Sequence, residues 1–91
     1  MAKILVIDDE RAIRNTLKEI LEFEGYTVEV AENGRQGLEK ALAGVYNLIF
    51  TDIKMPEMDG LEFLTAYHKG IQQIGGEDVP VVMISGHGTV E

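Results

Sequence analysis

The stretch KILVIDDE, residues 3–10, places an uninterrupted run of apolar residues directly before three acids. Such a run is typical of a strand that is buried on both faces of a parallel sheet. Residues 46–51 and 79–85 have the same character and predict two further strands, the second of them fully buried. Residues 27–31 alternate and carry β-branched side chains, so they predict a more exposed strand.

Apolar residues at helical spacing fill the intervals between these four strands. The three stripes consist of Ile13, Leu17, Ile20 and Leu21; of Leu38, Ala41 and Leu42; and of Leu64, Tyr67, Ile71 and Ile74. Gly25 and Gly44 stand where the first two helices should end, and Asp59 is placed to cap the third. This alternation predicts one α/β domain over residues 1–91, with a parallel sheet and helices on both faces.

Length and composition limit the functions open to the chain. Its 91 residues suffice for one domain, and the formal net charge of −8 argues against direct binding to nucleic acid. The absence of cysteine excludes disulfides and thiolate metal sites. The sequence contains neither an apolar run long enough to span a membrane nor a signal peptide, so we expect a cytoplasmic protein.

Polar residues follow three of the predicted strands. Asp8 and Asp9 follow the first strand, Asp52 ends the third, and Ser85 ends the fourth. Because the carboxyl ends of parallel strands share the edge of the sheet where ligands bind, these side chains should meet there. With the strand order 2-1-3-4, the three carboxylates would lie within a few ångströms of one another.

A cluster of three carboxylates is unfavourable unless a proton or a cation neutralises it. One like-charge pair at about 4 Å costs about 4 kcal/mol at an effective dielectric constant of about 20. Oxygen ligands without His or Cys suit Mg²⁺. A carboxylate beside the ion is a competent nucleophile for phosphoryl transfer, and Ser85 can donate a hydrogen bond to a phosphoryl oxygen.

Each of these residues also has a plainer structural interpretation. A single aspartate at a strand end, such as Asp52, is commonly a turn former. Asp8 and Asp9 could cap the first helix, and Ser85 before a glycine is commonly a turn residue. Three elements that converge on one edge are hard to explain by turns alone, which favours a functional site.

Three motifs in this order and spacing resemble the response-regulator receiver family of bacterial two-component systems. They are ILVIDDE at residues 4–10, DIKMPEMDG at 52–60 and VVMISG at 81–86. The resemblance implies a flavodoxin-like doubly wound sheet. It also implies phosphorelay signalling, in which a sensor histidine kinase transfers a phosphoryl group to an aspartate and the domain then controls an output domain, here a transcriptional one. Residues 85–89 resemble the nitrogen-regulation branch of the family.

The resemblance further implies roles at the acidic cluster. Asp52 looks like the phosphoacceptor and, together with Asp9, a direct ligand of Mg²⁺. Lys54 would offer its backbone carbonyl to the ion, and Asp8 would act through water.

Residues around the cluster also match the family. Pro56 and Gly60 would shape the loop after the third strand, and Ser85 resembles the switch hydroxyl that moves toward the phosphoryl group. His87 either influences hydrolysis of the acyl phosphate or is simply an exposed polar residue. His68 is expected on the solvated face of its helix.

The chain departs from the family pattern after the fourth predicted strand. A complete receiver continues with a fourth helix, a fifth strand that carries a lysine, and a fifth helix, so no residue here takes the role of that catalytic lysine. We therefore expect a receiver that is incomplete at its C-terminus, with residues 81–84 as an exposed apolar edge. A fragment of a longer protein and a homodimer, formed directly or by strand exchange, both fit this expectation.

Three other functions compete with phosphoacceptance by a signalling domain, whose own catalysis would be limited to its phosphorylation and dephosphorylation. A receiver-like interaction module would dimerise or bind a partner without phosphorylation. A haloacid-dehalogenase-type phosphatase requires Asp-x-Asp after the first strand, whereas residues 8–10 are DDE. A dinucleotide site requires a glycine-rich fingerprint after that strand, which this sequence lacks.

Overall fold

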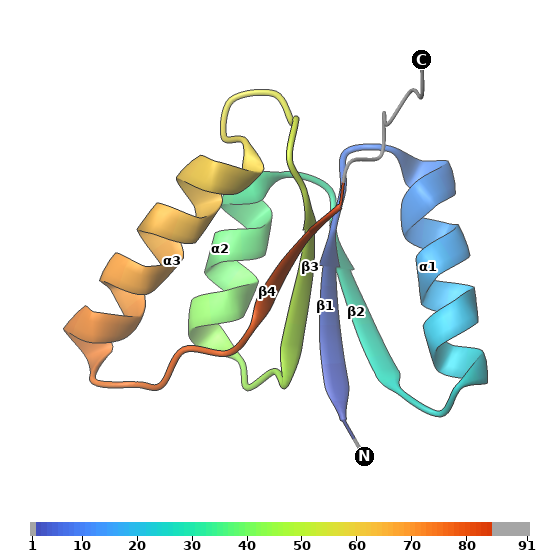
Figure 1. Cartoon of the computed structure of the whole chain (residues 1–91), viewed down its shortest axis with the longest axis horizontal. Coiled ribbons are helices and arrows are strands. Elements are labelled where there is room, and N and C mark those ends of the chain that lie inside the picture. Colours follow the sequence, from blue (N-terminus) through green and yellow to red (C-terminus); the bar gives the residue numbers. More distant parts are fainter. Residues whose placement is uncertain (1, 85–91) are drawn as a thin grey trace.

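The computed structural model describes residues 2–84, which form one parallel sheet flanked by three helices (Figure 1). The strands are β1 (Lys3–Ile7), β2 (Thr27–Ala31), β3 (Leu48–Asp52) and β4 (Val81–Ile84), and the helices are α1 (Arg11–Phe23), α2 (Gly34–Ala43) and α3 (Gly60–Ile74). All strand pairs are parallel, in the order β2-β1-β3-β4. The α/β class and the strand order 2-1-3-4 are therefore confirmed.

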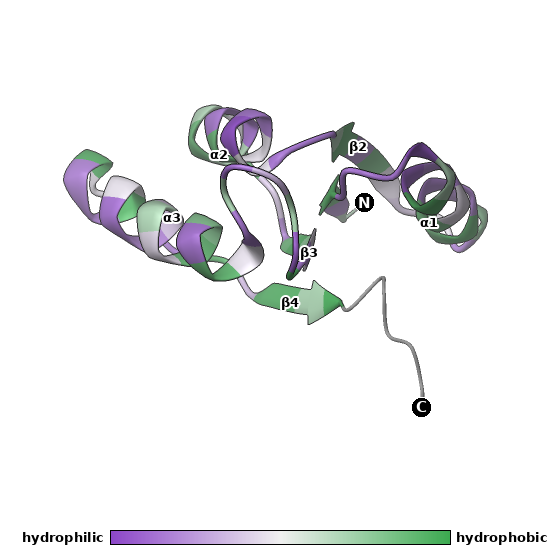
Figure 2. Ribbon diagram, turned by 90° about the horizontal axis from the view of Figure 1, so that it is seen from above, coloured by the Kyte–Doolittle hydropathy of each residue, from purple (hydrophilic) through white to green (hydrophobic). Residues whose placement is uncertain are grey.

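The helices cover the two faces of the sheet unequally. Seen from above, α2 and α3 lie side by side on one face, whereas α1 lies on the other face beside β2 and β1 (Figure 2). The larger core cluster contains the alternate residues Leu5 and Ile7 of β1 together with Ile49, Phe63 and Tyr67. The smaller cluster lies under α1 and contains Ile4, Val6 and Val28. Alternation along β1 thus feeds both cores, as a doubly covered strand requires.

Local sequence signals fix where two of the helices begin or end. The Asp59 side chain accepts a hydrogen bond from the Glu62 backbone at 2.8 Å, and the Glu62 side chain accepts one from the Asp59 backbone at 3.0 Å. This capping box confirms the predicted cap of α3. Helix α1 ends just before Gly25, whose φ of 99° lies in the left-handed region that favours glycine.

The fourth strand is the main correction to the sequence prediction. Within residues 2–84 it spans Val81–Ile84, so it begins two residues later than the predicted start at Val79, and it is only partly buried, with Val82 exposed by 40%. The reason is position, because β4 pairs only with β3 among the described residues and so forms an edge of the sheet. The exposed apolar edge was expected, and dimerisation through it stays a prediction.

The third strand begins later than expected, at Leu48, so Tyr46 precedes it. Tyr46 is nevertheless buried, and its hydroxyl donates a hydrogen bond of 2.7 Å to Glu29 on β2. Within residues 2–84, none of the helices combines the length and the apolar character that crossing a membrane requires.

Candidate phosphoacceptor and metal site

The carboxyl end of β1 places Asp8 at the upper edge of the sheet, as Figure 1 is drawn. Its backbone N–H donates to the Ala31 carbonyl at 3.1 Å, which extends the β1–β2 pairing by one residue. The side chain is fully buried, and Oδ1 accepts a hydrogen bond from the Glu10 backbone at 2.9 Å. Oδ2 is also buried and has no hydrogen-bond partner among the described residues.

The last residue of β3 is Asp52, which is 1% exposed. Its backbone lies opposite Ile84 in the β3–β4 register, and the neighbouring Thr51 is fully buried. Since β1 and β3 are adjacent, the two strand ends bring Asp52 beside Asp8. The predicted placement of Asp52 at the end of its strand is confirmed.

The three aspartates form one cluster. Asp8, Asp9 and Asp52 each offer a carboxylate oxygen that lies within 4.8 Å of the others. Asp9 is exposed, whereas the other two are buried, so the cluster opens to solvent on the side of Asp9. The expectation that these carboxylates lie within a few ångströms of each other is confirmed.

The electrostatics of the cluster disfavour its full ionisation. Burial raises the pKa of Asp8 above its ordinary value, and the negative charges of Asp52 and Asp9 raise it further. The hydrogen bond from the Glu10 backbone acts in the opposite direction. A buried carboxylate with one unpartnered oxygen, next to two further carboxylates, is a donor set that fits a small divalent cation such as Mg²⁺.

The loop between β3 and α3 passes close to Asp52. The Gly60 N–H donates to the Ile53 carbonyl at 2.7 Å, and a Cβ atom at Gly60 would lie 2.5 Å from the Asp52 carbonyl oxygen. Only glycine allows this approach of helix and strand end. Lys54 and Pro56 are exposed in the loop, and the Pro56 carbonyl accepts from the Met58 N–H at 2.7 Å.

Two features of the site have no clear signal in the sequence. The guanidinium of Arg14, one turn into α1, donates a 2.8 Å hydrogen bond to the Asp8 carbonyl. Glu57 adopts a φ of 69°, which costs a residue other than glycine about 1–2 kcal/mol. The separation of six residues between Asp8 and Arg14 spans a loop and a helix start, so it matches no periodic pattern.

The capping alternative for the aspartates is not what the structure shows. The N-cap residue of α1 is Glu10 rather than either aspartate, and its side chain makes no capping hydrogen bond. Asp9 is thus left facing the cluster rather than the helix N-terminus. The expected roles of Ser85 and His87 fall outside the described residues.

His68 is half-exposed, as expected of a solvated helix face, but it is not isolated. Its Nδ1 lies 2.5 Å from Oδ2 of Asp78, so the imidazole ties α3 to the segment before β4.

The parallel sheet in the order 2-1-3-4, with buried aspartates where β1 and β3 end, agrees with the architecture that the motifs predicted. Residues 4–91 match the model of the response regulator receiver domain. The chain therefore belongs to the receiver family of two-component signalling, as the motifs predicted.

Several response regulators are similar to this chain over nearly its whole length. Response regulator MprA of Mycolicibacterium vanbaalenii is 34% identical over 88 residues, which cover 97% of this chain and 36% of MprA. The uncharacterized transcriptional regulatory protein YkoG of Bacillus subtilis is 34% identical over 87 residues, or 96% of this chain and 36% of YkoG. The chain thus spans about a third of the length of these curated relatives. Neither relative bears on the nitrogen-regulation branch, which is not confirmed.

A solved structure adds a bound state of a relative. Response regulator protein TrrA from Thermotoga maritima, in complex with Mg²⁺ and BeF, is 39% identical, with a TM-score of 0.78. The match covers 96% of this chain and 73% of that chain.

Proposed function

We propose that this receiver domain accepts a phosphoryl group on Asp52 in a Mg²⁺-dependent reaction. The observation that carries the proposal is the convergence of three carboxylates within 4.8 Å at the ends of β1 and β3. Asp52 is the member of this cluster that ends β3, and it is almost completely buried. The alternative of a receiver-like module that acts without phosphorylation has no comparable observation in its favour.

Each aspartate has a distinct part in the proposed site. Asp9 and Asp52 would hold Mg²⁺ directly, with the Lys54 carbonyl, and Asp8 would act through a bound water. The ion would neutralise charge on the carboxylates and on the incoming phosphoryl oxygens. Because Asp9 is the exposed member of the cluster, the phosphoryl donor would approach Asp52 from the side of Asp9.

The chemical step requires a nucleophilic oxygen and a good leaving group. A carboxylate oxygen of Asp52 forms a bond to phosphorus while the bond between phosphorus and the imidazole nitrogen of a kinase histidine breaks. The electron pair of the broken bond returns to the imidazole, and the product is an acyl phosphate on Asp52. The domain is thus a substrate and cocatalyst of its own modification rather than an enzyme with a separate substrate.

The proposed partners follow from this chemistry. A sensor histidine kinase supplies the phosphoryl group, and an output domain that regulates transcription responds to the phosphorylated receiver. Both steps would take place in the cytoplasm. Pro56 and Gly60 shape the loop over Asp52, and the Ser85 hydroxyl moves toward the phosphoryl group once Asp52 is phosphorylated. The relatives MprA and YkoG, a response regulator and a transcriptional regulatory protein, support this assignment.

Phosphorylation by a small donor tests the proposal without the kinase. Phosphoramidate carries the same phosphorus–nitrogen bond as phosphohistidine, and intact-mass spectrometry reads the product. With Mg²⁺, the chain should gain the mass of one phosphoryl group, and the adduct should be labile to hydroxylamine, as acyl phosphates are. Asp52→Asn should abolish the gain, whereas Asp9→Asn should raise the Mg²⁺ concentration that the reaction needs.

Asp59→Asn is the matched control, because an asparagine side chain at this position would still cap α3 and the position lies outside the cluster. This variant should gain the phosphoryl group as the unchanged chain does. A mass gain that persists in Asp52→Asn would place the acceptor elsewhere. No gain in the unchanged chain, at a Mg²⁺ concentration that stabilises it against heat, would favour the unphosphorylated interaction module.

A further inference from the structure

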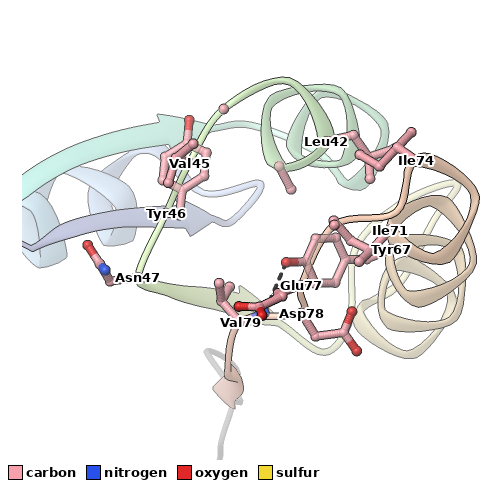
Figure 3. A pocket seen from close by; sticks show the side chains of 13 residues that line it. Leu42, Val45, Tyr46, Asn47, Tyr67, Ile71, Ile74, Glu77, Asp78 and Val79 are labelled. Carbon is pink, nitrogen blue, oxygen red and sulfur yellow. Dashed lines mark hydrogen bonds between the residues drawn. The ribbon is translucent and has the colours of Figure 1, made fainter.

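A cavity lies at the end of the sheet opposite to the aspartates. It is a cavity of about 470 Å³ between the C-terminal ends of α2 and α3 and the segments that lead into β3 and β4. Figure 3 shows the side chains that line it. Its volume falls within the range of protein pockets that bind organic groups. None of its lining residues belongs to the aspartate cluster, so this pocket is separate from the proposed phosphorylation site.

The interior of the pocket is apolar and is held in place by the core. Tyr67 and Ile71 of α3 are 2% and 7% exposed, and they line the pocket together with Leu42 and Val79. The Tyr67 hydroxyl accepts a 3.2 Å hydrogen bond from the Val79 N–H, which fixes the wall before β4 (Figure 3). A pocket with such walls is preformed, so binding would not have to order it first.

The apolar surface continues beyond the cavity onto its rim. Val45 and Ile74 line the pocket and are 83% and 61% exposed. Exposed apolar side chains on two sides of a pocket extend the area that an occupant can cover. A polypeptide segment, with one side chain in the cavity and neighbours on the rim, uses this area better than a small molecule does.

The charge of the pocket selects the kind of segment. Both charged residues that line it, Glu77 and Asp78, are acidic and exposed. Asp78 already pairs with His68, whereas Glu77 has no ion pair among residues 2–84. At this acidic rim, an anionic membrane surface or the acidic surface of a second copy, whose formal net charge is −8, would meet like charge, which disfavours either as the occupant of the pocket.

We propose that this pocket is a docking site for a partner polypeptide that inserts an apolar side chain flanked by lysine or arginine. The apolar side chain fills the space between Leu42, Ile71 and Val79, and a flanking cation pairs with Glu77. The proposal is independent of phosphorylation at Asp52, because the two sites share no residue. It adds a binding surface at the end of the sheet opposite to the aspartate cluster.

Short peptides in NMR titrations of the ¹⁵N-labelled chain test the proposal. The probe is acetyl-Lys-Phe-Arg-amide, with acetyl-Glu-Phe-Glu-amide and acetyl-Lys-Ser-Arg-amide as controls for charge and for the apolar side chain. The probe should shift the amide signals of the pocket, Val79 and Asn47 among them. Each control should bind at least about tenfold more weakly, the factor that 1.4 kcal/mol of binding free energy supplies.

Variants of the chain separate the two parts of the recognition. A Cβ atom at Gly76 would lie in ordinary contact with Ile71 at 3.7 Å and Ile74 at 3.8 Å, so the first side-chain atom of Gly76→Leu is accommodated and its remaining atoms should occupy the pocket. This variant should lose binding of the probe. Glu77→Gln should weaken the cationic probe but leave the affinity of acetyl-Ala-Phe-Ala-amide unchanged. Thr65→Leu, on the exposed face of α3 outside the pocket, is the control for added apolar surface.

Several outcomes would overturn the proposal. Equal binding of the acidic peptide, or shifts confined to the amide signals of α1, would show that the pocket does not select this segment. If Gly76→Leu changes the spectrum throughout, Val45→Ser removes the exposed rim instead and should weaken the probe severalfold. Unchanged affinity in Val45→Ser, or line broadening that shows self-association at the pocket, would equally contradict docking of a basic partner.

Discussion

The two faces of the sheet cover β3 to different extents, although β1 is buried on both. On the face covered by α2 and α3, Leu5, Ile7 and Ile49 have no exposed surface. On the face covered by α1, Leu48 and Phe50 of β3 are only partly buried. Neighbouring residues of one strand therefore contribute differently to the free energy of unfolding, because the helices above them bury them to different extents and not because their own hydrophobicity differs.

The three phenylalanines of the chain measure this difference with one residue type. Phe63→Ala should cost about 3–5 kcal/mol of unfolding free energy, because Phe63 is fully buried and stacks on Tyr67 at 5.9 Å between ring centroids. Phe50→Ala, on the half-covered face, should cost less than half as much. Urea denaturation followed by circular dichroism gives both values.

Phe23→Ala is the reference for these two variants, since Phe23 is 88% exposed at the end of α1. Its unfolding free energy should stay within about 0.5 kcal/mol of that of the unchanged chain. If Phe50→Ala proved as costly as Phe63→Ala, the face under α1 would be buried in solution, and the comparison between the faces would fail.

Close backbone approach on the α2 face gives the second-largest expected effect. Alanine at Gly37 would direct its Cβ into the Ile7 side chain, with the Ile7 Cγ1 atom only 2.8 Å away. Overpacking of this kind costs about 1–3 kcal/mol, which exceeds the gain of about 1 kcal/mol from replacing a helical glycine. The melting temperature should therefore fall.

Gly76→Ala is the matched control for Gly37→Ala, because its Cβ would meet nothing closer than 3.7 Å. Its melting temperature should be unchanged or slightly higher. A rise in the melting temperature of Gly37→Ala would mean that Ile7 can move aside, and that the face under α2 is packed more loosely than its full burial suggests.

The sequence predicts the features of the fold that depend on neighbouring residues, but not the extent to which other elements cover each strand. The segment 27–31 was predicted as a strand and is β2, and the cap at Asp59 is present, because both depend on short-range chemistry. The prediction that β4 is fully buried was wrong, since apolar content identifies a strand but does not say how many neighbouring strands or helices cover it. Tyr46 was assigned to a strand for the same reason, although its burial comes from packing outside β3.

The site was predictable only where topology alone decides the positions. The strand order brings Asp8 and Asp52 together, so parallel-sheet geometry sufficed for them. The bond from Arg14 to the Asp8 carbonyl, and the pocket at the other end of the sheet, depend on how helices lie across the strands. No pattern of spacing along the chain encodes such contacts directly.

Two adjacent residues where β1 ends are buried with opposite effects on the stability of the native state. Ile7 and Asp8 are equally buried, but burial raises the pKa of Asp8 and thus disfavours its charged form. In Mg²⁺-free buffer at neutral pH, Asp8→Asn should raise the unfolding free energy by about 1 kcal/mol, because the neutral amide costs less to bury than a carboxylate and is not repelled by Asp9 and Asp52. Oδ1 of the new side chain can still accept from the Glu10 backbone.

Mg²⁺ gives the check on Asp8→Asn. Millimolar Mg²⁺ should raise the melting temperature of the unchanged chain more than that of the variant, because at a given concentration a ligand stabilises the native state more when it binds more tightly. Asp59→Asn, outside the cluster, should respond to Mg²⁺ as the unchanged chain does. Equal responses of all three proteins would remove Asp8 from the proposed metal site.

The smallest expected effect concerns the hydrogen bond between Tyr46 and Glu29, at the border of the face covered by α2 and α3. The hydrogen bond from the Tyr46 hydroxyl, and then Lys3, lower the pKa of Glu29 below its ordinary value of 4.5. A carboxyl whose pKa is lowered by folding stabilises the native state above pH 4.5, and this contribution is lost as the pH falls through the lowered value. Tyr46→Phe should therefore cost less than about 1 kcal/mol at neutral pH, since Glu29 is half-exposed and screened by solvent.

Urea denaturation of both proteins between pH 3 and pH 7, a window set by the linkage relation, should show this difference shrinking toward the acidic end. A difference that is constant over that range would mean that Tyr46 stabilises the face through its ring packing alone, and that its bond to the Glu29 carboxylate contributes nothing.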